Sequence, residues 1–183
     1  MSVSLLAAVA ADLGFLLPWI RAFYEEESIA FDETRARSAV AQLMGDERLG
    51  HVCVVLLDLK PIGYLVLIRS FILEFGGPQL YVDELYISPE ARGRGHAKVA
   101  LEEVEKIART QGIKVLRLEV SENNARALSL YCKAGYERHA RCTMTKILPT
   151  TPNADSATDP QRGKPDMQSA HATTTPPAKL PVP

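Results

Sequence analysis

The chain has 183 residues, 46% of them apolar, which is enough for one well-filled core and suits a single domain. Its formal net charge of −1 provides no overall positive field that would attract nucleic acid or an anionic membrane, so we expect neither partner. The three cysteines are an odd number without a Cys-x-x-Cys pair, which argues against a disulfide framework and a zinc site; we expect no metal.

The N-terminal run is apolar without being a targeting signal. No Lys or Arg precedes Arg21, and Asp12 interrupts the apolar residues. The run therefore matches neither a secretory signal, which begins with basic residues, nor a bilayer span. We expect a cytoplasmic protein.

The C-terminal end changes character at Pro149. Residues 149–183 contain eight of the twelve prolines and no aromatic residue. A segment with so little to bury cannot offset the entropy lost on ordering. The sequence therefore predicts one folded domain over residues 1–148 and a disordered, Pro- and Thr-rich tail over residues 149–183.

The first half of the domain is predicted to contain one strand, two helices and three antiparallel strands, in that order. A short strand is predicted at residues 3–8, and Asp12 is expected to cap a helix that runs to about Glu27 with Pro18 inside it. A second helix is expected to begin after Asp32. Strands follow at three ranges that turn residues separate: 51–57, 62–75 and 79–87.

The second half continues with helix, strand, helix and paired strands. Apolar residues at helical spacing predict a helix that Gly112 ends, and a buried strand follows at residues 114–120. Another helix is expected from Asn124 to about Lys133, and then a closing hairpin at residues 137–147. The order predicts an α/β chain with one mixed sheet.

A glycine-rich loop precedes the helix that Gly112 ends. Gly93 and Gly95 let backbone N–H groups converge on an anion, and the helix that starts near His96 adds its positive dipole end. Arg92 and Arg94 can supply charge-assisted hydrogen bonds. Composition alone leaves open an ordinary strand-to-helix turn with solvated arginines.

Residues 82–137 closely resemble the GNAT acetyltransferase superfamily. They match its phosphate motif, Gln/Arg-x-x-Gly-x-Gly/Ala, and its later motif, Asn-x-x-Ala-x-x-x-Tyr followed by Gly-Phe/Tyr. The matching residues are Arg92, Gly93, Arg94, Gly95, His96 and Ala97, then Asn124, Ala127, Tyr131, Gly135 and Tyr136. The resemblance implies a central mixed, largely antiparallel sheet flanked by helices, with a V-shaped cleft that holds acetyl-CoA.

The resemblance also implies where the cofactor lies. Main-chain groups of Leu85, Tyr86 and Ile87 would pair with the pantetheine arm as an added strand does. The loop would hold the pyrophosphate, and Asn124, Ala127 and Tyr131 of the later motif would also contact the cofactor. The strand at 114–120 would diverge to make room, which leaves the thioester near Glu119–Ser121.

Tyr131 and two acidic residues are the candidate catalytic groups. At the family position, the Tyr131 phenol would protonate the departing thiolate. Asp83 or Glu84 would deprotonate the acceptor amine. Alternation along a strand places Asp83 with Leu85 and Glu84 with Tyr86 and Val82, so one carboxylate alone would face the cleft. Glu84 is slightly preferred, and a solvated sheet face is the alternative.

The acceptor is indicated by acidic residues. Glu26 and Glu27 end the first predicted helix, and Glu119 lies near the end of the strand that diverges; these three are the candidate substrate-binding residues. A negative mouth would attract a small cationic amine or a lysine-like side chain. The leading hypothesis is direct acetyl transfer to a primary amine. A protein N-acetyltransferase, a catalytically silent acyl-CoA-binding module and a homodimeric state stay open.

Overall fold

The structure is a computed structural model that describes residues 2–148. The tail expected at residues 149–183 lies outside the described residues. Of these, residues 2–140 belong to one compact unit and residues 141–148 to a second.

Five strands form one mixed sheet. Their order in the sheet follows the sequence: β1 (Val3–Ala7), β2 (Gly50–Leu57), β3 (Lys60–Ile72), β4 (Gly77–Ile87) and β5 (Val115–Leu118). Neighbouring strands are antiparallel from β1 to β4, and β5 runs parallel to β4. The predicted mixed, largely antiparallel sheet is confirmed. The residues of β5 are half-buried rather than buried, because β5 lies at the edge of the sheet.

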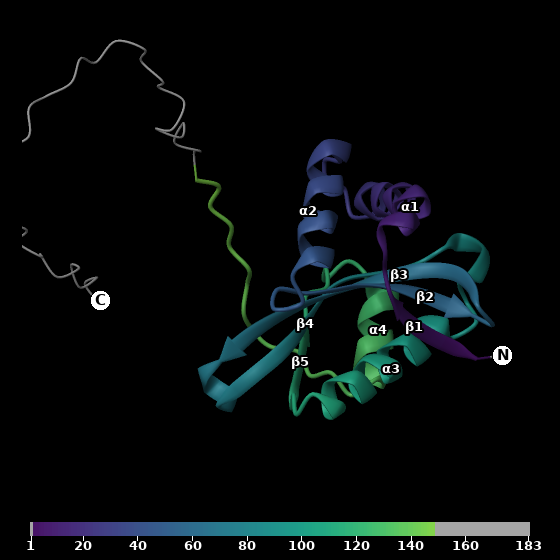
Figure 1. The fold of residues 1–183 in the computed structure, drawn as a ribbon. Helices are drawn as coiled ribbons and strands as arrows, with labels where there is room; N and C mark the ends of the chain where they lie inside the picture. The colour runs from purple at the N-terminus through teal and green to yellow at the C-terminus, as the bar shows by residue number, and fades with distance from the viewer. Residues whose placement is uncertain (1, 149–183) are drawn as a thin grey trace, which may run out of the picture. The chain divides into compact units, whose positions relative to one another are not determined.

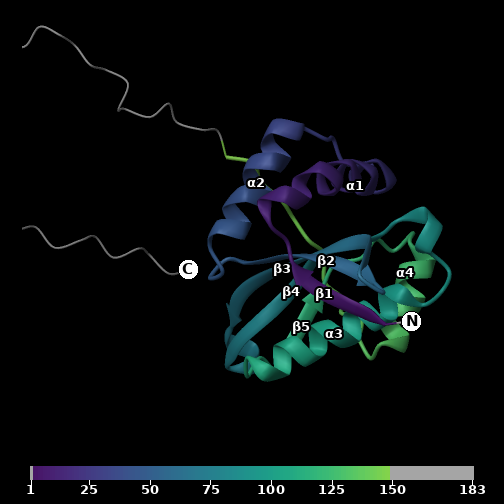
Figure 2. The same ribbon diagram turned by 45° about the vertical axis from the view of Figure 1, so that its right-hand side comes forward.

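Four helices cover the two faces of the sheet. They are α1 (Leu13–Glu26), α2 (Glu33–Gly45), α3 (His96–Thr110) and α4 (Ala125–Lys133). Figure 1 and Figure 2 show α1 and α2 above the sheet and α3 and α4 below it. Each face therefore has its own core. Leu16 of α1 and Tyr64 of β3 are fully buried in the first, and Leu101 of α3 and Leu80 of β4 in the second.

Local signals explain where most helices begin and end. The Asp32 carboxylate accepts a hydrogen bond from the Arg35 amide at 2.9 Å, so the predicted cap of α2 is confirmed. Asp12 precedes α1 as expected, but its carboxylate bonds the Val9 amide at 2.8 Å and closes a 3₁₀ turn (Ala10–Asp12) instead of capping α1. Gly112 follows α3 with φ +67°, a conformation that glycine adopts without strain.

The closing hairpin predicted at residues 137–147 is wrong. The described part of the chain has no strand after β5. Side chains from 137 to 148 are exposed, with Met144 and Ile147 about 90% accessible. Most residues of this segment are polar or charged, so pairing them would bury little apolar area.

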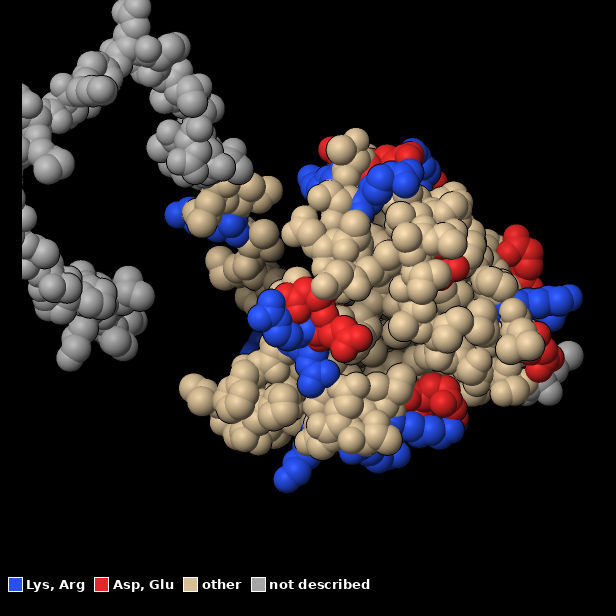
Figure 3. Space-filling view, in the orientation of Figure 1, with Lys and Arg blue, Asp and Glu red and all other residues tan. Residues whose placement is uncertain are grey.

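Surface charge and helix length complete the description. Figure 3 shows acidic and basic side chains in small patches of both signs on the face drawn there. None of the helices between residues 2 and 148 is long and apolar enough to cross a membrane.

Candidate active site

A β-bulge in the middle of β4 sets the direction of the two candidate carboxylates. Val66 of β3 lies opposite Glu84, and the next residue of β3, Leu67, lies opposite Val82. Asp83 is therefore an extra residue without a partner of its own, and it shifts the alternation of side chains by one place.

The bulge corrects the expected facing of these residues. Val82 packs with Leu85 and Ile87 in the core between the sheet and α3. Glu84 lies on the opposite face, toward α1, where it contacts Tyr64. The expectation that Glu84 shares a face with Val82 is wrong, because it assumed a regular pleat. The same distortion brings the charges of Asp83 and Glu84 close to one hydroxyl, that of Tyr24. Both carboxylates therefore influence the α1 side of the sheet.

Glu84 is held by tyrosines from two other elements. The Tyr64 hydroxyl donates to Glu84 Oε2 at 2.6 Å, and the Tyr64 side chain has no exposed surface. The Tyr24 hydroxyl of α1 is also within hydrogen-bonding reach of the carboxylate. Burial raises the pKa of Glu84, and the charge of Asp83 adds to this effect, while the two hydroxyls act in the opposite direction. Glu84 is thus a carboxylate that binds a proton more readily than an exposed one.

Asp83 has a more open environment. It is exposed, and within residues 2–148 its carboxylate has no hydrogen-bond donor. Partial burial of the Asp83 carboxyl group raises its pKa, and the negative charge of Glu119, just beyond β5, raises it further. Burial raises the pKa of Tyr81 of β4, and the nearby Glu119 carboxylate, within hydrogen-bonding reach, raises it further. Asp83 and Glu119 are therefore neighbouring solvent-facing carboxylates at the point where β4 and β5 separate.

β4 and β5 part at the level of these acidic residues. Their ladder runs from Gln79–Val115 to Val82–Leu118 and ends there, while β4 continues to Ile87. In the described residues, the β5 side of β4 is thus unpaired beyond Val82. Leu85, Tyr86 and Ile87, the residues expected to pair with pantetheine, lie in this stretch.

The glycine-rich loop has the backbone of an anion-binding turn. Gly93 and Gly95 have φ of +79° and +83°, and a Cβ at either position would meet no atom within 4 Å. Gly95 is the N-cap of α3, so the free N–H groups of this helix lie beside the loop. His96 is buried, and its Nε2 has no hydrogen-bond partner among the described residues. Arg94 is exposed and Ala97 half-buried. These residues fit a phosphate group.

Arg92 and Glu26, expected to bind cofactor and acceptor respectively, bind each other. An Arg92 terminal nitrogen donates to Glu26 Oε1 at 2.7 Å and to Oε2 at 3.1 Å. Arg92 Nε donates to the carbonyl oxygen of Ile87 at 2.6 Å, and the guanidinium lies 5.1 Å from the centre of the Tyr86 ring. The first residue of the phosphate motif is therefore attached to α1.

Tyr131 of α4 packs against the core on the α3 side of the sheet. Its ring contacts that of Tyr136, with the two centroids 5.9 Å apart. Burial raises the pKa of Tyr131, and the charge of Glu27 raises it further. The phenol is therefore protonated at neutral pH, and it lies within electrostatic reach of one predicted substrate-binding residue.

The remaining motif residues have a structural explanation. The Asn124 side-chain oxygen accepts from the Ala127 amide at 3.0 Å and caps α4. This contact fixes the start of the helix that carries Tyr131. The Asn-x-x-Ala pattern is thus a capping pattern in this chain.

Sequence reasoning missed Tyr24 and Tyr64. Tyr64 lies in an apolar strand, where a tyrosine is typical of the core, and Tyr24 immediately precedes the acidic run that ends α1. A buried tyrosine usually finds a hydrogen-bond partner for its hydroxyl, and this was the available signal. The partner itself was not predictable, because it depends on the bulge.

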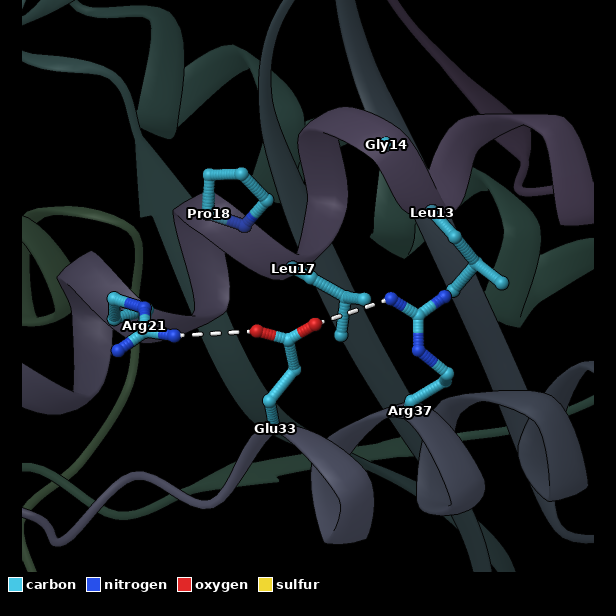
Figure 4. Close-up of a pocket in the computed structure, with 7 residues that line it drawn as sticks. All are labelled: Leu13, Gly14, Leu17, Pro18, Arg21, Glu33 and Arg37. Atoms are coloured by element: carbon cyan, nitrogen blue, oxygen red, sulfur yellow. Dashed lines mark hydrogen bonds and ion pairs between the residues drawn. The ribbon is translucent and has the colours of Figure 1, made fainter.

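A separate cavity of about 320 Å³ lies between α1 and α2 (Figure 4). Glu33 of α2 bridges Arg21 of α1 and Arg37 of α2, each at 3.2 Å. None of the predicted site residues lines this cavity.

Comparison with known proteins identifies the family. The model of the acetyltransferase (GNAT) family matches residues 16–136. A thialysine N-epsilon-acetyltransferase of Bos taurus is 28% identical over 137 residues, which cover 70% of this chain and 80% of the relative.

Solved structures have the same fold. An integron cassette protein from the mobile metagenome of Cole Harbour Salt Marsh is 27% identical, with a TM-score of 0.68 over 80% of this chain and 91% of that one. A predicted acetyltransferase of Clostridium acetobutylicum, solved with acetyl-CoA, is 15% identical, with a TM-score of 0.65 over 79% and 96% of the two chains. The family match covers the site from α1 to the end of α4, and the chain therefore belongs to the GNAT family of acetyltransferases, enzymes with acetyl-CoA as co-substrate.

Proposed function

We propose that the protein transfers the acetyl group of acetyl-CoA directly to the primary amine of a small cationic acceptor. The observation that carries this proposal is the position of two adjacent acidic residues of β4, Asp83 and Glu84, where the pairing of β4 with β5 ends. A carboxylate with a raised pKa at that point is suited to accept a proton from an ammonium group. The name of the Bos taurus relative, which acts on an amine, supports the same acceptor class.

Two parts of the chain would hold acetyl-CoA, which supplies an activated acetyl group. The loop Gly93–Ala97 and the first N–H groups of α3 would bind the pyrophosphate, with Arg94 as the charged ligand. The buried, unpartnered Nε2 of His96 supports this assignment, because a ligand hydrogen bond would satisfy it. The free edge of β4 at Leu85, Tyr86 and Ile87 would hold the pantetheine arm.

The catalytic roles divide between β4 and α4. Glu84 would take one proton from the acceptor ammonium, directly or through water, and leave a neutral amine; Asp83 is the alternative base. A main-chain N–H near Leu85 would polarise the acetyl carbonyl. Tyr131 would give its proton to the departing thiolate, because its raised pKa keeps it protonated. The amine nitrogen would lose its second proton as the tetrahedral intermediate collapses to the amide, and this proton would return to the Tyr131 phenolate. Glu84 would pass its proton to solvent, so each turnover would release one proton net and restore both groups.

Several carboxylates favour a cationic acceptor. Glu27 lies near Tyr131, and Glu119 lies near Asp83, so negative charges flank the proposed reaction point on two sides. Such a field raises the local concentration of amines that carry a second positive charge. We therefore expect diamines and lysine-like amines to be better acceptors than neutral ones.

A panel of acceptors tests the proposal. Diamines, lysine analogues, amino sugars and an N-terminal peptide are each incubated with acetyl-CoA, and the release of free CoA thiol is followed. We expect the highest kcat/KM with a small dication. Preferred turnover of the peptide would replace this acceptor class with a protein substrate. Tight acetyl-CoA binding without turnover on any amine would indicate a silent binding module.

A further inference from the structure

We propose that Arg92 is a positioning residue for the acceptor side of the reaction rather than a ligand of the cofactor's pyrophosphate. The inference rests on the proposed amine acetylation for its kinetic consequences, but its structural part is independent of that reaction. Arg92 opens the phosphate motif and borders Gly93, yet its side-chain contacts lead away from the loop, toward α1 and β4.

The guanidinium is already engaged on three sides. Its Nε–H donates to the Ile87 carbonyl, one terminal nitrogen donates to both oxygens of Glu26, and its face lies over the Tyr86 ring. Only 29% of the Arg92 side chain is exposed, against 46% for Glu26. A planar, forked cation held by a main-chain oxygen, a carboxylate and an aromatic face has little freedom to turn toward a phosphate.

Arg92 joins the C-terminal residue of a helix to the C-terminal residue of a strand. Glu26 is the last residue of α1, and Ile87 is the last residue of β4. Because 66 residues separate Arg92 from Glu26 in sequence, this contact holds together parts of the chain that no local turn connects.

The C-terminal end of α1 and the residue after it carry two groups that would lie beside the acceptor. Tyr24, two residues before Glu26, is within hydrogen-bonding reach of Glu84, and Glu27, the residue after it, raises the pKa of Tyr131. By fixing Glu26 against β4, Arg92 therefore fixes the position of both residues relative to the proposed base and acid. Arg94 and the backbone of the loop remain for the pyrophosphate.

The first test is acetyl-CoA binding measured by calorimetry without an acceptor. Arg92→Gln should change the Kd by less than about twofold. Arg94→Gln should weaken binding about tenfold or more, the usual effect of losing a charge-assisted hydrogen bond. Weakening of the same size in both variants would make Arg92 a pyrophosphate ligand and overturn the proposal.

The second test is steady-state kinetics on the best acceptor. Arg92→Gln and Glu26→Gln should each raise the KM for the amine about 5–20-fold, with the KM for acetyl-CoA nearly unchanged. The double variant should lose no more than either single one, because both substitutions break the same contact. Additive losses would show that the two residues act separately.

Arg21→Gln is the matched control. Like Arg92, Arg21 bonds a glutamate, Glu33, and lies over an aromatic ring, that of Phe31 at 4.4 Å. Arg21, however, lies on α1 and joins α1 to α2 (Figure 4). Its loss should leave the amine KM within about twofold. If Arg21→Gln raised the amine KM as much as Arg92→Gln does, the cause would be a general loosening of α1 and not the loss of the Arg92–Glu26 contact.

Hydrogen exchange provides a readout that needs neither turnover nor cofactor. Amides of residues 23–27 should exchange faster in Arg92→Gln than in the parent protein and Arg94→Gln. If Arg92→Gln fails to fold, Glu26→Gln breaks the contact from its more exposed partner. Unchanged exchange in either variant overturns the positioning role, whereas failure of every amine in the parent enzyme would overturn only the proposed reaction.

Discussion

Tyr131 is the residue on which the proposed chemistry depends most. Tyr131→Phe keeps the ring against Tyr136 and removes only the hydroxyl. If the phenol protonates the departing thiolate, kcat should fall about 10²–10⁴-fold, the usual contribution of one positioned general acid. Acetyl-CoA affinity should change little. Stopped-flow or steady-state release of CoA thiol measures the first quantity and calorimetry the second; near-normal kcat would remove Tyr131 from the mechanism.

Tyr64 should control the proton affinity of Glu84. The Tyr64 hydroxyl stabilises the ionised carboxylate, so Tyr64→Phe should raise the pKa of Glu84. The base would then be protonated up to a higher pH, and the acidic limb of kcat/KM should move upward by about one pH unit. A full pH profile is the measurement.

Tyr136→Phe is the control for that profile. The Tyr136 hydroxyl is buried without a hydrogen-bond partner in the described residues, so its removal breaks no contact with Glu84. The acidic limb should stay in place. An unshifted limb in Tyr64→Phe would indicate that Glu84 is not the base, and Asp83→Asn would then be expected to abolish the limb.

At the scale of elements, the glycines that precede and follow α3 allow substitutions at its two ends to be compared. Gly95 precedes the helix with φ +83° and Gly112 follows it with φ +67°. Asparagine tolerates this conformation better than other side chains, so Gly95→Asn and Gly112→Asn should lower the melting temperature by similar, small amounts.

The two substitutions should differ in cofactor binding. A side chain at Gly95 stands in the proposed pyrophosphate site, so Gly95→Asn should weaken acetyl-CoA about tenfold or more, whereas Gly112→Asn should not. Calorimetry on both variants decides the matter. Equal affinities would place the pyrophosphate elsewhere than at the N-terminus of α3.

The elements themselves were largely predictable because their signals are local. Asp32 caps α2 through a residue three positions away, and Gly112 ends α3 through its own backbone conformation. The bulge at Asp83 was not predictable, because it is a property of the register between β3 and β4. The same holds for Arg92 and Glu26, whose contact depends on how α1 lies against β4. The hairpin predicted at residues 137–147 failed for a related reason: strand pairing is not a local property.

At the scale of the whole molecule, the ionised Glu84 carboxylate should lower the free energy of unfolding at neutral pH. Burial raises the pKa of Glu84 in the folded state, so the ionised carboxylate costs stability. The penalty is absent below the unfolded pKa and appears as the pH rises through the folded pKa. Glu84→Gln keeps an acceptor for Tyr64 and should raise the melting temperature by about 2–4 °C at pH 7.5.

Scanning calorimetry from pH 5 to pH 8 tests this prediction. The advantage of Glu84→Gln should shrink toward the acidic end, because the raised pKa of Glu84 lets the native carboxyl take up a proton there more readily than an exposed carboxyl does. Glu102→Gln on the exposed side of α3 is the control, because the pKa of Glu102 is lowered by Lys98 and its replacement should give no gain. A constant advantage across the range would exclude ionisation as its cause.

The extra residue in β4 has a consequence for how such an enzyme can change over time. If Asp83 were deleted, Val82 and Glu84 would become neighbours in a regular pleat, each still on its present face and opposite its present partner on β3. Neither core would need to repack. The position is therefore a place where a lineage can gain, lose or exchange an acidic group without disturbing the scaffold, and acceptor preference can diversify there independently of fold stability.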